Sequence, residues 1–293
     1  MQGIDLGLHV VDFTLAGGPP ALARNLRDIA VSAEQAGFTK LSVMDHLFQV
    51  NIAGPPEHEM LEAYTTLGFL AAHTSRVQLV PWVTAAVYRE PGLLAKCITT
   101  LDVLSQGRAC LGIGAAWNEV EARGLGLPFP PLAERYERLE EALQICLQMW
   151  SDSEEPFDGQ HYHLGRTLNS PQSLQRPHPP ILIGGGGERK TLRLVAQYAD
   201  ISNLFPGPEL PHKLDVLRRH CADVGRDYDD IEKTLMIALD IGRGGEKADE
   251  VLAQLKGYAD LGIQHVHTRL PLADDLSQIE LFAEKIIPAA ASL

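Results

Sequence analysis

Residues 179–187 of the chain are PPILIGGGG, a short apolar strand that leads into four consecutive glycines. Ile181, Leu182 and Ile183 leave this strand without a polar face, and residues 79–83 (LVPWV) share that property. Strands that are apolar on both faces are typical of parallel sheets covered by helices on each side. The segment after the glycines has helical periodicity, so the stretch predicts a strand followed by a helix.

This strand–helix unit recurs along the whole chain. Eight units of this kind in 293 residues favour an α/β fold, a closed (β/α)8 TIM barrel, formed by a single domain over residues 1–293. A doubly wound open sheet is the alternative, but it leaves the number of units unexplained. The predicted strands are Ile4–Val10, Lys40–Met44, Val77–Thr84, Ala109–Gly114, Pro180–Gly184, Asp200–Asn203, Lys233–Ile241 and His265–Leu270.

Residues 151–179 interrupt the alternation between the fourth and fifth strands. They are rich in Pro, Gly, Asp and His and have no long period, so we expect an excursion from the barrel with a short hairpin at Pro156–Leu164. Among the helices, Gly37 is expected to end the first. Pro91 is expected to begin the helix after the third strand, in which Leu104 is expected to face inward.

Composition and charge exclude several classes of partner. Lys and Arg number 25 against 38 Asp and Glu, a net charge of −13, and an acidic surface repels nucleic acids and anionic lipids. No segment has the ~18 consecutive apolar residues of a membrane helix, and no secretory signal begins the sequence. The four cysteines form no C-x-x-C pair, which indicates unpaired thiols. We therefore expect a cytoplasmic protein with a small-molecule substrate, and neither a nucleic acid nor a membrane as partner.

A barrel carries its active site at the carboxyl ends of its strands, and the fifth strand ends in four glycines, Gly184, Gly185, Gly186 and Gly187. Glycines allow an anion to approach the backbone, and the helix that follows contains Arg189, Lys190 and Arg193. The pattern predicts a phosphate cradle. A flexible turn is the alternative, since the spacing matches neither the dinucleotide motif nor the P-loop.

Asp45 and His46 follow the second strand. Because an imidazole exchanges protons near neutral pH, His46 is the predicted acid–base residue, with a structural histidine as the alternative. The pairs His161/His163 and His265/His267 could suggest metal ligands, but neither follows the first strand, where a barrel metallohydrolase would need them. We expect no metal site.

Six motifs occur in order along the chain and carry a family resemblance. They are SVMDHLF (42–48), VT with YREP (83–84 and 88–91), LDVLSQGR (101–108), LGIGAAW (111–117), RYERLEEAL (135–143) and PPILIGG (179–185). In these motifs the chain resembles the luciferase-like monooxygenase superfamily, especially the branch that uses the deazaflavin coenzyme F420. The resemblance covers essentially the whole chain. It implies a barrel that binds a deazaflavin, or alternatively the flavin FMN, in its mouth, often within a homodimer.

The resemblance also implies roles for particular residues. Asp45 would contact the cofactor ring, and His46 matches the proton-transferring histidine of F420-linked sugar-phosphate dehydrogenases. A bulge that often contains a cis peptide would back the ring, Ala115 and Ala116 would line the cofactor, and the four glycines would hold its phosphate. The residues that match the bulge are Val83, Thr84 and Ala85, and those expected in the substrate pocket are His9, Phe13 and Trp117.

Trp117 departs from those dehydrogenases, which carry a second acid–base glutamate at this position. A hydrophobic substrate therefore suits the chain better than a sugar phosphate. We expect an F420-dependent oxidoreductase that transfers a hydride between the deazaflavin and a small organic substrate, with His9 as a reserve acid. An FMN-dependent monooxygenase is the alternative, and a non-catalytic flavin-binding protein is an alternative of another class.

Overall fold

The computed structural model describes residues 3–271 and 276–293. Apolar, helix-covered segments form the strands of one sheet, as the sequence predicts. These strands are β1 (Asp5–Val10), β2 (Lys40–Val43), β3 (Gln78–Pro81), β4 (Thr84–Ala85), β5 (Leu111–Gly114), β8 (Ile181–Gly184), β9 (Ile201–Leu204), β10 (Glu232–Ala238) and β11 (His265–Arg269).

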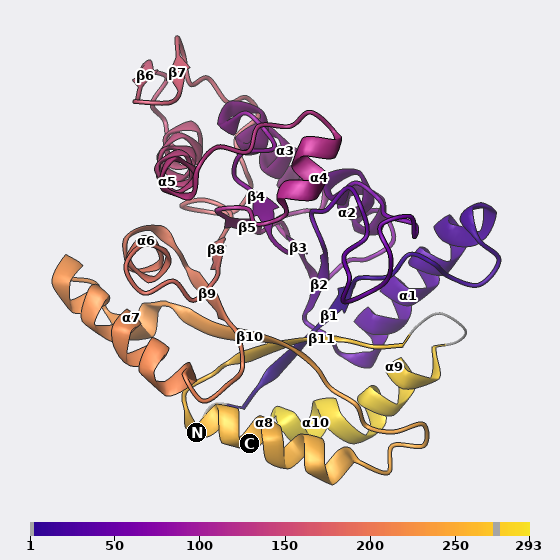
Figure 1. Cartoon of the computed structure of the whole chain (residues 1–293). Helices are drawn as coiled ribbons and strands as arrows, with labels where there is room; N and C mark the ends of the chain where they lie inside the picture. The colour runs from indigo at the N-terminus through magenta and orange to yellow at the C-terminus, as the bar shows by residue number, and fades with distance from the viewer. Residues whose placement is uncertain (1–2, 272–275) are drawn as a thin grey trace.

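The sheet closes into a barrel. Its strands follow the order β3-β2-β1-β11-β10-β9-β8-β5-β4, and every pair within it is parallel. A parallel bridge between Leu79 and Ala109 joins β3 to the residues just before β5. Helices surround the ring of strands (Figure 1). The predicted (β/α)8 barrel is confirmed.

The third strand differs from its prediction. It was expected to be continuous over Val77–Thr84, but it is divided into β3, which pairs with β2, and β4, which pairs with β5. The peptide bond between Trp82 and Val83 at this division is cis. Counted together, β3 and β4 occupy one of the eight strand positions.

The helices follow the predicted apolar periods with some local differences. They are α1 (Leu22–Ala36), α2 (Ala63–Ala71), α3 (Pro91–Leu104), α4 (Glu119–Gly124), α5 (Leu132–Met149), α6 (Thr191–Tyr198), α7 (Leu210–Val224), α8 (Ala248–Asp260), α9 (Ser277–Leu281) and α10 (Ile287–Ala290), with short η1 (Pro19–Ala21) and η2 (Tyr228–Asp230) turns.

Gly37 caps α1 with φ of 99° and Pro91 begins α3, as predicted. The prediction for Leu104 was wrong. It is the last residue of α3 and is 71% exposed, because the buried stripe of the helix ends one turn earlier. Short α4 was not predicted, and the last helix is interrupted by the π-helix η3 (Phe282–Ile286).

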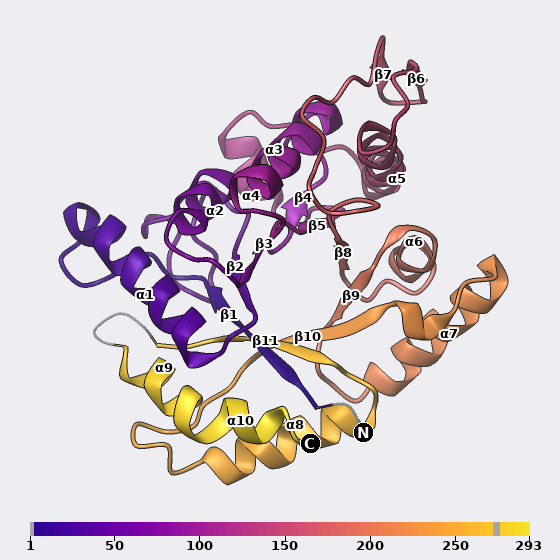
Figure 2. The ribbon, with the colours of Figure 1, turned by 180° about the vertical axis from the view of Figure 1, so that it is seen from behind.

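The excursion lies outside the barrel and contains the predicted hairpin. Strand β6 (Phe157–Asp158) pairs antiparallel with β7 (His163–Leu164), beyond the outer side of α5 (Figure 2). The buried carboxylate of Asp102 in α3 accepts hydrogen bonds from the backbone N–H groups of Leu174 (2.7 Å) and Gln175 (3.1 Å). The excursion is thereby held against the helical layer, away from the cavity described below.

Apolar clusters inside and outside the ring of strands hold the barrel together. The largest lies between strands and helices, and a smaller one fills part of the interior with Val80, Trp82, Cys110, Leu182 and Ile201. The chain ends meet below the barrel, where the Ile4 N–H donates to the Ala290 carbonyl (2.9 Å). None of the described helices has the length and apolar character needed to cross a membrane.

Candidate active site

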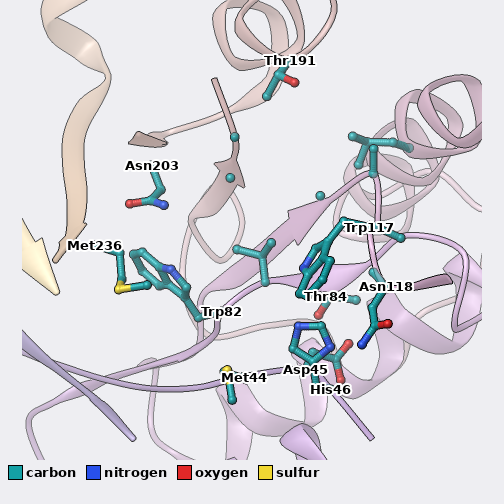
Figure 3. A pocket seen from close by; sticks show the side chains of 18 of the residues that line it. Met44, Asp45, His46, Trp82, Thr84, Trp117, Asn118, Thr191, Asn203 and Met236 are labelled. Atoms are coloured by element: carbon teal, nitrogen blue, oxygen red, sulfur yellow. The ribbon is translucent and has the colours of Figure 1, made fainter. Parts of the chain in front are cut away.

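A cavity of about 520 Å³ opens at the carboxyl ends of the barrel strands, a size suited to a small molecule or cofactor. In Figure 3, Trp82 and Met236 lie on one side of it, and His46, Trp117 and Asn118 lie on the other. Thirteen of the predicted site residues line this cavity: His9, Asp45, His46, Val83, Thr84, Ala85, Ala115, Ala116, Trp117, Gly184, Gly185, Gly186 and Gly187.

Phe13 is the predicted pocket residue that the structure does not bring to the cavity. Its side chain has no exposed surface and packs in the core between strands and helices. The ring follows β1 but turns away from the barrel mouth, because burying a phenyl group in that core removes its whole surface from water.

His46 is held by a carboxylate that sequence reasoning missed. Its Nδ1 lies 3.1 Å from Oε1 of Glu121, and the Trp117 indole meets the imidazole edge-on with ring centroids 5.2 Å apart. An ionised carboxylate accepts a hydrogen bond from Nδ1–H, which fixes the tautomer and leaves Nε2 as the second functional nitrogen.

Glu121 itself is completely buried in α4. Its carboxylate accepts hydrogen bonds from the backbone N–H groups of Leu47 (2.6 Å) and Phe48 (2.8 Å) and from the Tyr88 hydroxyl (2.8 Å). Burial would raise the pKa of Glu121, but the hydrogen bonds from His46 and from these backbone groups outweigh it and lower the pKa. The carboxylate is therefore charged and rigidly placed beside His46.

Asp45 has a different partner from its neighbour His46, and both follow the end of β2. Its two oxygens accept hydrogen bonds from Arg89 at 2.6 and 2.9 Å, and Arg89 also reaches Glu62 at 2.5 Å. Burial raises the pKa of Asp45, and the guanidinium opposes this rise. Asp45 thus forms the charged wall of the cavity through a buried ion pair.

Val83, which lines the cavity, lies against Gly112, Gly114 and Gly184. A Cβ atom at Gly114 or Gly184 would lie 3.1–3.2 Å from the Val83 side chain, and one at Gly112 would lie 2.0 Å from the Pro81 carbonyl oxygen. The glycines of β5 and β8 therefore make room for the Val83 side chain of the predicted bulge, which lies against both strands.

The glycine loop packs against two hydroxyl groups that were not predicted as site residues. A Cβ at Gly187 would lie 2.9 Å from the Thr191 hydroxyl and 3.2 Å from the Tyr136 hydroxyl, and these two hydroxyls are 2.8 Å apart. Gly185 has φ of 123°, which side-chain-bearing residues rarely adopt. The loop and the two hydroxyls form a polar end of the cavity with the character of an anion cradle.

Other site features have recognisable partners. Ala116 has φ of 65°, and its carbonyl accepts a hydrogen bond from Arg135 (2.6 Å), which fixes the loop after β5. Arg193, predicted behind the glycine loop, pairs with Glu140 (3.2 Å).

Among the missed residues, Glu121 had one sequence signal: Asn118 caps α4 by accepting from the Glu121 N–H, a spacing typical of helix starts. That signal predicts the helix but not the contact with His46.

The fold and cavity define a parallel α/β barrel with a cofactor-sized site at its mouth. The chain belongs to the luciferase-like monooxygenase family, whose model matches residues 8–285. The predicted family resemblance is confirmed, and with it the expectation of an enzyme.

Two relatives illustrate the range of sequences. An uncharacterized protein of Mycobacterium tuberculosis is 31% identical over 230 residues, which cover 77% of this chain and 76% of the relative. An F420-dependent glucose-6-phosphate dehydrogenase of Nakamurella multipartita is 26% identical over an alignment of 336 positions that covers 94% of each chain.

Two solved structures share the fold. The monooxygenase RslO1 of Streptomyces bottropensis superposes with a TM-score of 0.82 at 20% identity, over 97% of this chain and 99% of that one. The F420-dependent tetrahydromethanopterin reductase of Methanopyrus kandleri superposes with a TM-score of 0.78 at 18% identity, over 98% and 99%.

Proposed function

We propose that the protein is an F420-dependent oxidoreductase that transfers a hydride between the deazaflavin and a small hydrophobic organic substrate. The observation that carries this proposal is the pairing of His46 with buried Glu121 in the wall of a cavity that ends in the glycine loop. Relatives named as F420-dependent dehydrogenases support the choice of cofactor.

The residues present fit such a cofactor. The glycine loop, with its left-handed Gly185 and the hydroxyls of Tyr136 and Thr191, would hold a phosphate. The Val83 bulge and the loop of Ala115 and Ala116 offer apolar surface for a ring system. When bound, F420 would supply the hydride acceptor or donor, and the protein would orient it and manage the proton.

His46 performs the proton transfer in this proposal. Charged Glu121 accepts from Nδ1–H and aligns the ring, so when the ring is doubly protonated its Nε2–H proton is available at the cavity wall. Hydride arriving at one atom of a polarised double bond leaves negative charge on its neighbour, and Nε2–H of His46 protonates or stabilises that atom. In the reverse direction the same nitrogen accepts a proton.

The rim of the cavity supports a hydrophobic substrate. Four apolar side chains there keep more than half of their surface in water: Ile52, Trp117, Leu132 and Phe205. Among the described residues, no lysine or arginine lines the cavity. A sugar phosphate would therefore find no cationic side chain in the described lining, whereas an apolar substrate would cover the exposed rim.

The cofactor is tested by titrating the cofactor-free protein separately with F420 and with FMN, followed by absorbance or fluorescence. We expect tighter binding of F420 and reduction or oxidation of its deazaflavin without oxygen consumption. Tighter binding of FMN with oxygen-consuming turnover would instead establish the monooxygenase alternative. Tight binding of either without turnover across a panel of carbonyl and alkene compounds would favour the non-catalytic alternative.

Gly185→Val should weaken cofactor binding by more than ~10-fold, about 1.4 kcal/mol, because the side chain is strained at φ of 123° and obstructs the loop. The matched control is Gly225→Val, at φ of 71° in the cap of α7, where a Cβ meets no atom within 4 Å. This control places the same side chain at a positive φ away from the cavity and should bind the cofactor normally. Equal affinities in both variants would place the phosphate elsewhere.

The homodimer implied by the family resemblance remains a prediction.

A further inference from the structure

Several hydroxyl groups of the cavity lining already have protein partners. The Thr84 hydroxyl lies 2.6 Å from the Tyr64 hydroxyl, and the hydroxyls of Tyr136 and Thr191 lie 2.8 Å from each other. Asn203 differs from these residues, because one end of its side-chain amide is held by the protein and the other end is not.

The held end of the amide is its oxygen. Asn203 lies in β9, is only 2% exposed and lines the cavity. Its Oδ1 accepts a hydrogen bond from the hydroxyl of Thr234 (3.2 Å), a residue of β10 without exposed surface. The same hydroxyl lies 3.2 Å from the Ser202 carbonyl oxygen. The amide is therefore anchored to the neighbouring strand.

The free end of the amide is its nitrogen. Nδ2 of Asn203 donates a hydrogen bond to none of the residues that the structure describes. Buried amide groups are nearly always hydrogen-bonded, to protein or to water. An anchored amide that lines a cavity and keeps its donor unused is therefore suited to contact a ligand.

The position of Asn203 defines which part of a ligand it would meet. Asn203 is the register partner of Gly184, and its carbonyl accepts from the Gly185 N–H (3.1 Å). Gly184 lies against the Val83 side chain, whereas Gly185 leads into the glycine loop. In Figure 3, Asn203 is seen between Thr191, at the polar end of the cavity, and Trp82.

A ligand that fills both ends of the cavity must pass Asn203. With a ring system against the Val83 bulge and a phosphate in the glycine loop, its connecting segment would run along Gly184 and Gly185. An apolar segment would leave the Asn203 amide unpaired, so a polar segment suits the site better. A hydroxyl group both donates and accepts, which lets it pair with either end of an amide.

We infer that Asn203 binds a hydroxyl group of the ribityl chain that joins the ring to the phosphate of the cofactor. Thr234 is a positioning residue, because it acts only by holding the amide. The inference rests on the proposed function for the places of the ring and the phosphate. It applies to F420 and to the FMN alternative, since both carry this chain, and no role implied by the family resemblance falls on β9.

The test compares two ligands that differ only in the chain. The cofactor-free protein is titrated, with fluorescence as the readout, with a 10-ribityl deazaflavin and with its 10-methyl analogue, which has the same ring and no hydroxyls. Asn203→Leu keeps a side chain of similar size but removes the amide. We expect it to weaken binding of the ribityl compound by about 5- to 10-fold, the effect of one lost hydrogen bond, and to leave binding of the methyl compound nearly unchanged.

Two further variants separate the hydrogen bond from the shape of the cavity. Met236→Leu alters an apolar lining residue near Asn203 and should change the affinities of both ligands by the same factor (Figure 3). Thr234→Val leaves Asn203 in place but removes the hydroxyl that holds its oxygen. It should weaken binding of the ribityl compound alone, by less than Asn203→Leu does, and it decides the inference if Asn203→Leu does not fold.

Two results would overturn the inference. An equal loss of affinity for both ligands in Asn203→Leu would mean that Asn203 contacts the ring or only shapes the cavity. No loss for either ligand would mean that the amide faces the substrate or water instead of the cofactor.

The same comparison with riboflavin and its 10-methyl analogue distinguishes failure of the inference from failure of the proposed function. Binding of the flavins but not of the deazaflavins would count against F420 as the cofactor, and the effect of Asn203→Leu on riboflavin would then decide the inference. If the wild type bound neither ring system, the inference and the proposed function would both be wrong.

Discussion

Replacing His46 with alanine should lower turnover by ~10²–10⁴-fold at saturating cofactor while leaving cofactor affinity nearly unchanged. The reason is geometric. The imidazole is fixed by Glu121 at 3.1 Å and by the Trp117 indole, so it is positioned for proton transfer and is not simply a packing element. The measurement is a full cofactor titration of each variant, with saturated turnover on any substrate that the F420 assay identifies.

Glu121→Gln provides the matched comparison for His46→Ala. The amide keeps the shape of the carboxylate but loses the charge that fixes Nδ1 as the donor, so we expect a smaller loss of turnover and a displaced pH profile. His9→Ala isolates the reserve acid in the same assay. Full activity in His46→Ala would end its assignment, and weakened cofactor binding with normal saturated turnover would assign His46 to packing against the ring.

Much of the site was predictable because, in a barrel, the positions of the strand ends in the sequence determine which residues lie together in space. Residues at the carboxyl ends of parallel strands must meet at one mouth, so Asp45, His46 and the glycines of 184–187 could be placed together from strand ends alone. The same logic applied to Trp117, which follows β5. No knowledge of side-chain contacts was needed for these predictions.

The contacts that orient those residues were not predictable in the same way. Glu121 reaches His46 from a helix 75 positions away in sequence, and its role depends on the path of a loop between β5 and α4. Phe13 shows the converse error: it follows β1, but loop residues are free to turn either way, and the apolar core determined its direction. The division between β3 and β4 likewise lies in an apolar run whose periodicity does not reveal it, and only the family resemblance implied a bulge at residues 83–85.

Arg89→Met should destabilise the cofactor-free protein by ~3–5 kcal/mol, because it leaves the buried Asp45 carboxylate without its partner. The two side chains of this pair are 14% and 1% exposed, so solvent screens it little. Urea unfolding near pH 7 measures the effect. The control Arg166→Met breaks the pair of Arg166 with Glu154, whose side chains are 62% and 49% exposed, and should change stability little.

The dependence of this loss on pH identifies its origin. Burial raises the pKa of Asp45 in the folded protein, and removing Arg89 raises it further. A folded carboxyl with a raised pKa binds more protons than the unfolded one, so stability falls as pH rises between the unfolded value of about 3.9 and the folded value. The deficit of Arg89→Met should therefore be largest near neutral pH and shrink on acidification.

Adding Asp45→Asn to Arg89→Met should recover much of the stability at neutral pH, since the amide carries no charge to desolvate. A deficit that grows on acidification, or a double variant as unstable as Arg89→Met alone, would show that Arg89 stabilises the fold through Glu62 and Tyr64 instead of through Asp45.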